Sequence, residues 1–347
     1  MECVKLALMT ALLVRLSAPV VGAQEPTPQP PVPFEPSQPP QAAPAQPLPE
    51  RHGVFKSGVE LVALNVTVTD AARKYVTGLG QADFAVFEDG VQQQLTFFAA
   101  DAAPIDLAIL IDTSSSMQDK MDDVHQAAIG FARTLRPADR GAVVGFDTGV
   151  RVLQGFTANP DEIEAAIRAA RANGGTALHN ALYISLKEFA KLGRENQDVR
   201  RQAIVVLSDG EDTASLLSFD DVLQLAKQSG VSIYTITMKS KYTAAALSRG
   251  PRRYFSQSEY SMKSLAQETG AQAFFPLEVR DLSSVYASIA NELAHQYALA
   301  YAPKNGRRDG SFRRVVVTVP TRPDARPRTR LGYLAQRDVR AARAITP

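Results

Sequence analysis

The feature that most constrains the fold is an alternation of short apolar runs with amphipathic stretches, extending from about residue 103 to 296. In the stretch 119–135 the apolar residues recur at helical spacing, and Asn159-Pro160 is typical of a helix start. Strands that alternate with helices form a parallel sheet covered on both faces. We therefore predict an α/β fold with a doubly wound, mostly parallel sheet flanked by helices. Its strands are expected at 105–111, 142–146, 150–156, 203–207, 231–238 and 271–275.

Both flanks of this region have strand patterns instead. Residues 59–70 alternate between apolar and polar side chains, and Asp89-Gly90 joins two β-like runs, the second of which ends at Phe98. Asp-Gly is typical of a tight hairpin turn, because both central residues of that turn take positive φ. Residues 297–301, 312–320 and 331–335 return to strand patterns with no helix between them. We predict that 52–103 and 297–335 together form a smaller all-β domain beside the α/β domain at 104–296.

The N-terminus is typical of an export signal. Lys5 precedes a mostly apolar run, and Val21-Gly22-Ala23 offers small residues for cleavage, so we predict a signal peptide at 1–23. Half of the chain's 22 prolines lie between residues 24 and 50, which predicts a disordered linker at 24–51. Residues 336–347 form a basic tail. We expect a secreted or periplasmic protein with no transmembrane helix after cleavage and no nucleic-acid partner.

Three polar loops carry the candidate chemistry. Asp112-Thr113-Ser114-Ser115-Ser116 follows the first strand, Gly174-Gly175-Thr176 lies in a later loop, and Ser208-Asp209-Gly210 follows the strand at 203–207. In a doubly wound sheet, ligands bind beyond the carboxyl ends of the strands, where the strand order reverses. We expect Asp112 and Asp209 to face each other there, with the hydroxyls of Ser114, Ser116 and Thr176 between them.

Oxygen ligands of this kind suit a hard divalent cation. Two close carboxylates repel each other unless a cation lies between them, and Mg²⁺ takes about six oxygen ligands. The loops contain no His or Cys, which argues against zinc or iron. Each motif alone is more often a helix cap or a turn. Their occurrence together favours a site for Mg²⁺, with Mn²⁺ or Ca²⁺ as alternatives.

The three loops, with their flanking residues, resemble the metal-ion-dependent adhesion site of von Willebrand factor type A (VWA) domains. The resemblance is carried by Leu-Ile-Asp-Thr-Ser-Ser-Ser-Met at 110–117, Gly-Gly-Thr-Ala-Leu at 174–178 and Val-Val-Leu-Ser-Asp-Gly at 205–210. It implies that Ser114, Ser116 and Thr176 coordinate Mg²⁺, that Asp112 and Asp209 act directly or through water, and that a partner protein's Asp or Glu completes the site. The stretches 76–79, 83–90 and 297–301 are also similar to a VWFA-related family described in acidobacteria.

The resemblance implies metal-dependent protein–protein binding or adhesion and no catalytic activity. Metal-assisted hydrolysis at the same site is the alternative. Glu211 is the one candidate general base in these loops apart from the proposed ligands. A third possibility is a structural domain whose site stays empty. Basic and aromatic residues suit recognition of an acidic partner, although an ordinary solvated insertion has the same composition. The predicted partner-binding rim consists of Glu211, Lys241, Tyr242, Arg252, Arg253 and Tyr254.

Overall fold

The computed structural model describes residues 61–100, 103–195, 200–208, 211–238 and 256–337, which all belong to one compact unit, Ser57–Pro347. The predicted signal peptide, the proline-rich linker and residues 338–347 of the basic tail lie outside these ranges. Within them, no helix combines the length and the apolar character that a membrane span needs.

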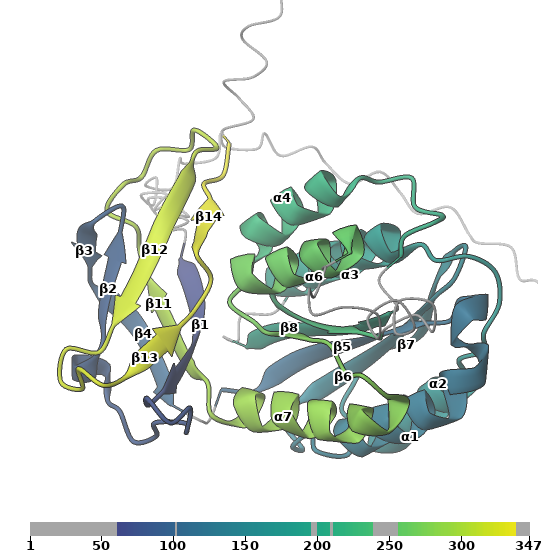
Figure 1. Cartoon of the computed structure of the whole chain (residues 1–347). Helices are drawn as coiled ribbons and strands as arrows, with labels where there is room; N and C mark the ends of the chain where they lie inside the picture. Colours follow the sequence, from purple (N-terminus) through teal and green to yellow (C-terminus); the bar gives the residue numbers. More distant parts are fainter. Residues whose placement is uncertain (1–60, 101–102, 196–199, 209–210, 239–255, 338–347) are drawn as a thin grey trace, which may run out of the picture. The chain divides into compact units, whose positions relative to one another are not determined.

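A six-stranded sheet forms the centre of the α/β region (Figure 1). Its strands are β5 (Ile105–Asp112), β6 (Arg140–Phe146), β7 (Val150–Thr157), β8 (Arg201–Ser208), β9 (Ser232–Thr237) and β10 (Ala273–Phe274). The order is β10-β9-β8-β5-β6-β7, and every pairing is parallel except that of β6 with β7. The chain runs from β5 to β6 on one side and later returns to β8 on the other, so the strand order reverses at β5.

Helices cover both faces of this sheet (Figure 1). One face packs against α1 (Met121–Ala132), α2 (Pro160–Ala169) and α7 (Leu282–Ala294), and the other against α3 (Leu178–Glu195), α4 (Phe219–Ser229) and α6 (Gln257–Glu268). Successive residues of β5 alternate between the two cores, with Ile109 in the first and Leu110 in the second. All eight residues of β5 are therefore buried. The predicted fold class is confirmed.

The predicted start of α2 agrees with the structure, whereas the predicted bounds of α1 do not. The Asn159 side chain accepts a hydrogen bond from the amide of Asp161 at 3.0 Å, so α2 has the predicted cap. The helix predicted at 119–135 is shorter, because a 3-10 helix at Ser115–Lys120 precedes α1 and the helix ends at Ala132.

The two flanks, for which strands were predicted, form two four-stranded sheets. Their strands are β1 (Val62–Thr69), β2 (Ala85–Glu88), β3 (Val91–Gln93), β4 (Leu95–Ala100), β11 (Tyr297–Tyr301), β12 (Phe312–Thr318), β13 (Arg326–Arg328) and β14 (Gly332–Leu334). The sheet orders are β13-β1-β11-β4 and β14-β12-β2-β3. Because β11 pairs with β1 and β4, and β12 pairs with β2, strands from both ends of the chain share each sheet.

Two details of the flanks differ from the prediction. Asp89 and Gly90 take φ of 47° and 82°, which confirms the turn, but the run that follows is two strands. The chain changes sheets at Gln94, so β3 pairs with β2 whereas β4 pairs with β11. Strand β13 was not predicted, because Arg-Pro-Arg has no strand pattern. It lies at the edge of its sheet, where a proline without an amide donor is tolerated.

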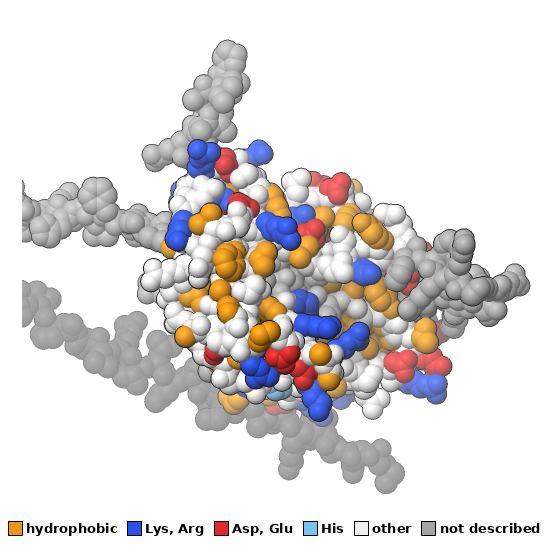
Figure 2. All heavy atoms as spheres, turned by 60° about the vertical axis from the view of Figure 1, so that its left-hand side comes forward, with side chains coloured by type: hydrophobic (Ala, Val, Ile, Leu, Met, Phe, Trp, Pro, Cys, Tyr) orange, Lys and Arg blue, Asp and Glu red, His pale blue; other side chains and the backbone are white. Residues whose placement is uncertain are grey.

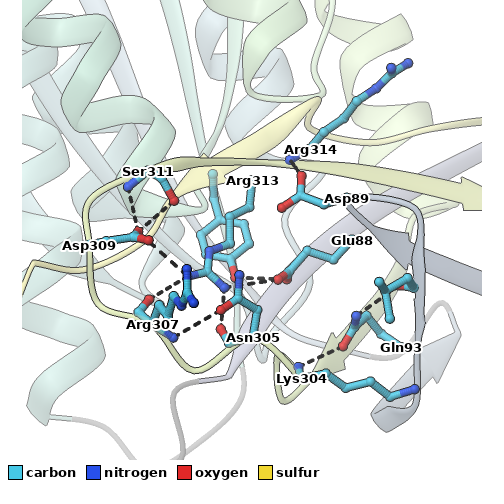
Figure 3. A network of polar contacts seen from close by, with 12 residues as sticks. Glu88, Asp89, Gln93, Lys304, Asn305, Arg307, Asp309, Ser311, Arg313 and Arg314 are labelled. Atoms are coloured by element: carbon cyan, nitrogen blue, oxygen red, sulfur yellow. Dashed lines mark hydrogen bonds and ion pairs between the residues drawn. The ribbon is translucent and has the colours of Figure 1, made fainter.

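A buried ionic network joins β2, β11, β12 and β14 (Figure 3). The side chains of Glu88 and Arg313 are 2% and 1% exposed, and Arg313 Nη1 lies 3.3 Å from Glu88 Oε1. The hydroxyls of Tyr301 and Tyr333 donate to Glu88 Oε2 at 2.8 and 2.9 Å. Burial, followed by these hydrogen bonds to Glu88, raises the pKa of both tyrosines. The folded protein therefore favours the neutral tyrosines.

We expect this network to make stability fall at alkaline pH. Because the pKa of each tyrosine is raised on folding, its contribution is complete below about pH 10 and is lost as pH rises above that value. Denaturant unfolding at about pH 8 and about pH 11 measures the fall in the free energy of unfolding. Tyr301→Phe is expected to show a smaller fall than the wild type. An equal fall in both proteins would contradict the assignment.

Candidate metal centre

Asp112 ends β5 and is fully buried. Its Oδ1 accepts a hydrogen bond from the amide of Ser114 at 2.8 Å, and its Oδ2 accepts one from the hydroxyl of Ser208 at 2.6 Å. Ser208 is the last residue of the neighbouring strand β8. The carboxylate is thus held in one orientation between the carboxyl ends of the two central parallel strands.

The loop after β5 places two serine hydroxyls together. Ser114 has an extended backbone, with φ −70° and ψ 161°, and the 3-10 helix begins at the next residue. This change of direction brings the hydroxyl oxygens of Ser114 and Ser116 to 2.9 Å from each other. Ser114 is buried and Ser116 is exposed, so the pair reaches from the interior to the surface. The buried side chain of Met117 anchors the turn.

Backbone hydrogen bonds connect this loop to the one that carries Thr176. The amide of Ser115 donates to the carbonyl of Gly174 at 3.0 Å, and the amide of Asn173 donates to the carbonyl of Thr113 at 2.6 Å. Gly174 takes φ of 69°, and a Cβ there would lie 2.5 Å from the Thr148 hydroxyl oxygen, which explains the glycine. Thr176 itself is buried.

The third loop is bound to the second. The amide of Thr176 donates to the hydroxyl of Thr213 at 3.0 Å, and the amide of Thr213 donates back to the carbonyl of Thr176 at 2.9 Å. Asp212 Oδ2 accepts from the amide of His179 at 2.8 Å and lies 3.2 Å from His179 Nδ1. The residues that follow Asp209-Gly210 are therefore held beside Thr176.

Four of the five predicted ligands are described, namely Asp112, Ser114, Ser116 and Thr176, and they occupy two hydrogen-bonded loops. Of the predicted rim, Glu211 is exposed and lines a cavity of about 410 Å³ with His179 and Asp212. The predicted site residues that lie outside the described residues are Asp209, Lys241, Tyr242, Arg252, Arg253 and Tyr254.

Sequence reasoning missed three supporting residues. Ser208 orients Asp112, Thr213 binds the backbone of Thr176, and Asp212 binds the start of α3 through His179. Ser208 belongs to the predicted loop Ser208-Asp209-Gly210, and Asp212 lies two residues beyond it, so their place in the sequence could have indicated these roles. No spacing or composition signal marks Thr213.

The donor set fits a hard cation, because it consists of a buried carboxylate and hydroxyl oxygens. Among the described residues, no group of three or more His, Cys, Asp or Glu side chains lies close enough to hold a metal ion. The described oxygen donors of the two loops are the Asp112 carboxylate and the hydroxyls of Ser114, Ser116 and Thr176. Zinc prefers nitrogen and sulfur ligands, so the chemistry favours Mg²⁺.

This region is a doubly wound α/β domain, and the motif Asp-x-Ser-x-Ser lies at the carboxyl end of its central strand. Together the fold and the motif indicate the class of domain. Residues 106–269 match the von Willebrand factor type A domain family, so this chain contains a VWA domain. That match begins in β5 and ends just after α6.

Similar proteins occur in several bacteria. A UPF0353 protein of Mycobacterium marinum is 26% identical over 202 residues, covering 54% of this chain and 60% of that protein. An uncharacterized protein of Synechocystis is 33% identical over 112 residues, or 31% of this chain and 26% of that protein. The chain thus spans less than two thirds of the length of either relative.

Solved structures are similar at lower identity. A von Willebrand factor type A protein from Catenulispora acidiphila is 15% identical with a TM-score of 0.47, covering 74% of this chain and 75% of that one. The vWF domain of a type V pili tip protein from Porphyromonas gingivalis is 16% identical with a TM-score of 0.43, covering 55% of this chain and 95% of that one.

Proposed function

We propose that this chain is an exported VWA protein that binds a partner protein through a divalent cation, Mg²⁺ in the first instance. Asp112, Ser114, Ser116, Thr176 and Asp209 would hold the cation. When bound, it supplies a Lewis-acidic position for a carboxylate oxygen from an Asp or Glu of the partner. The observation that supports this most strongly is the Asp112 carboxylate, held between the ends of β5 and β8 and followed directly by a loop with two adjacent serine hydroxyls.

The same contacts favour binding over hydrolysis. Hydrolysis needs a general base beside the activated water. Both oxygens of Asp112 accept hydrogen bonds from the protein, and those of Asp212 accept from the amides of His179 and Ser215. Glu211, the acid that the enzyme alternative requires, has an exposed side chain. Weak neutral hydroxyl ligands leave the cation able to accept a strong outside carboxylate.

Affinity capture with the immobilised protein tests the proposal. We expect partner proteins to be retained in Mg²⁺, released by EDTA, and lost when Ser114→Ala is the bait. Ser115→Ala is the matched control, because the exposed Ser115 hydroxyl is not a proposed ligand and the backbone amide at 115 still donates to the carbonyl of Gly174. Equal capture in EDTA would contradict the proposal. Metal-dependent hydrolysis of a phosphate or carboxylate ester, lost in Ser114→Ala, would favour the enzyme alternative.

A further inference from the structure

A second cavity lies away from the metal centre, between α4 and the start of β1, β12 and β14. Its volume is about 840 Å³, within the range typical of small-molecule sites. Three basic side chains, those of Lys227, Arg330 and Arg337, line it, and none of the described lining residues is acidic. Figure 2, in which the β-sheets come forward, shows Lys and Arg side chains among hydrophobic ones on this side of the molecule.

Arg330 is the unusual member of this cavity. It is only 9% exposed, and its Nε has no hydrogen-bond partner. Two other arginines of the flanks lie beside acidic side chains: the half-buried Arg328 lies 2.6 Å from Glu292, and the buried Arg313 contacts Glu88. Among the described residues, no hydrogen bond or ion pair partners the Arg330 guanidinium, which lies 5.1 Å from the centre of the Tyr333 ring. Burial lowers the pKa of Arg330 to about 10.

A buried, unpaired guanidinium is costly unless an anion compensates it. The residues beside Arg330 indicate which other chemical groups a ligand of this cavity would need. Lys227 Nζ lies 5.3 Å from the centre of the Phe312 ring, and Phe312 and Leu61 are 44% and 52% exposed. Since all three residues line the cavity with Arg330, it combines positive charge with an apolar rim.

We propose that this cavity binds a small organic oxyanion, whose phosphate or carboxylate group pairs with Arg330 and whose apolar part contacts Phe312 and Leu61. A planar guanidinium suits either group, because it can donate two parallel hydrogen bonds. The second cation, Lys227, is partly compensated by Glu268 at 3.4 Å and would contribute less.

Calorimetry on the full chain, with phenyl phosphate and benzoate as probes, tests this inference and separates the two kinds of anion. We expect at least one probe to bind, Arg330→Met to weaken that binding by about tenfold or more, and Lys227→Met by about threefold. Arg314→Met is the matched control and should bind as the wild type does. Its side chain is exposed and points away from the buried network (Figure 3). Binding should be unchanged in EDTA, which separates this site from the metal centre.

Thermal unfolding gives a second readout. Without ligand, the Tm of Arg330→Met should be no lower than that of the wild type, because the substitution removes an unpaired buried charge. Addition of the probe should raise the Tm of the wild type but not that of Arg330→Met. The Lys227→Met affinity supports the site even if Arg330→Met folds poorly. The proposal is overturned if neither probe binds the wild type, or if Arg330→Met binds equally well.

Discussion

Asp112→Asn is expected to weaken Mg²⁺ binding by about a hundredfold or more. The substitution removes the negative charge of a proposed ligand, which costs more than the loss of a residue that only hydrogen-bonds to a ligand. Asparagine keeps the size of the side chain and one oxygen acceptor for the Ser114 amide or the Ser208 hydroxyl. Titration calorimetry with Mg²⁺ measures the change. Asp123→Asn, which removes an exposed carboxylate on α1, is the matched control and should bind as the wild type does.

The choice of asparagine keeps loss of binding distinct from loss of folding. Alanine would leave the Ser114 amide and the Ser208 hydroxyl without their acceptor, at a cost of about 1–3 kcal/mol for each buried donor. Asp112→Asn should therefore unfold within a few degrees of the wild type. Unchanged Mg²⁺ affinity in a folded Asp112→Asn protein would remove Asp112 from the ligand set.

Arg313→Met is expected to destabilise the folded protein by about 3–5 kcal/mol. Glu88 would stay buried and, among the described residues, would keep the Tyr301 and Tyr333 hydroxyls alone as donors. The carbonyls of Asn305 and Arg307 would also lose the guanidinium that donates to them. Denaturant unfolding followed by circular dichroism, which suits a chain without tryptophan, measures the loss.

Two further variants identify the buried charge as the cause. Arg314→Met changes the next residue, whose side chain is exposed, and should shift stability by no more than about 0.5 kcal/mol. Adding Glu88→Gln to Arg313→Met should recover part of the loss, because a neutral amide still accepts from Tyr301 or Tyr333. A double variant less stable than Arg313→Met would show that the charge is not what destabilises it.

Local periodicity explains why so much of the fold could be predicted. Strand β5 is an apolar run because both of its faces are covered, and β1 has a buried face that alternates with a more exposed one. The Asp89-Gly90 turn follows from its positive φ angles. These signals lie within a few residues of each other, so a single sequence contains them.

Long-range partners could not be predicted in the same way. Glu88 and Arg313 are 225 positions apart, and no pattern in the sequence around either residue indicates that the two are paired. The division of β3 from β4 depends on which sheet each strand joins, and β13 forms only because the edge of β1 is available. At the site, the loop motifs were visible, whereas the Ser208 and Thr213 contacts depend on the neighbouring loops.

In the proposed metal centre, oxygen atoms of Asp112, Ser114, Ser116, Thr176 and Asp209 surround one hard cation. Anomalous diffraction from crystals soaked in Mn²⁺ tests it most directly. We expect one strong peak at the carboxyl ends of β5 and β8, about 2.0–2.3 Å from the hydroxyls of Ser114 and Ser116. A soaked crystal with no peak there, and with Asp112 bonded only to protein groups, would contradict it.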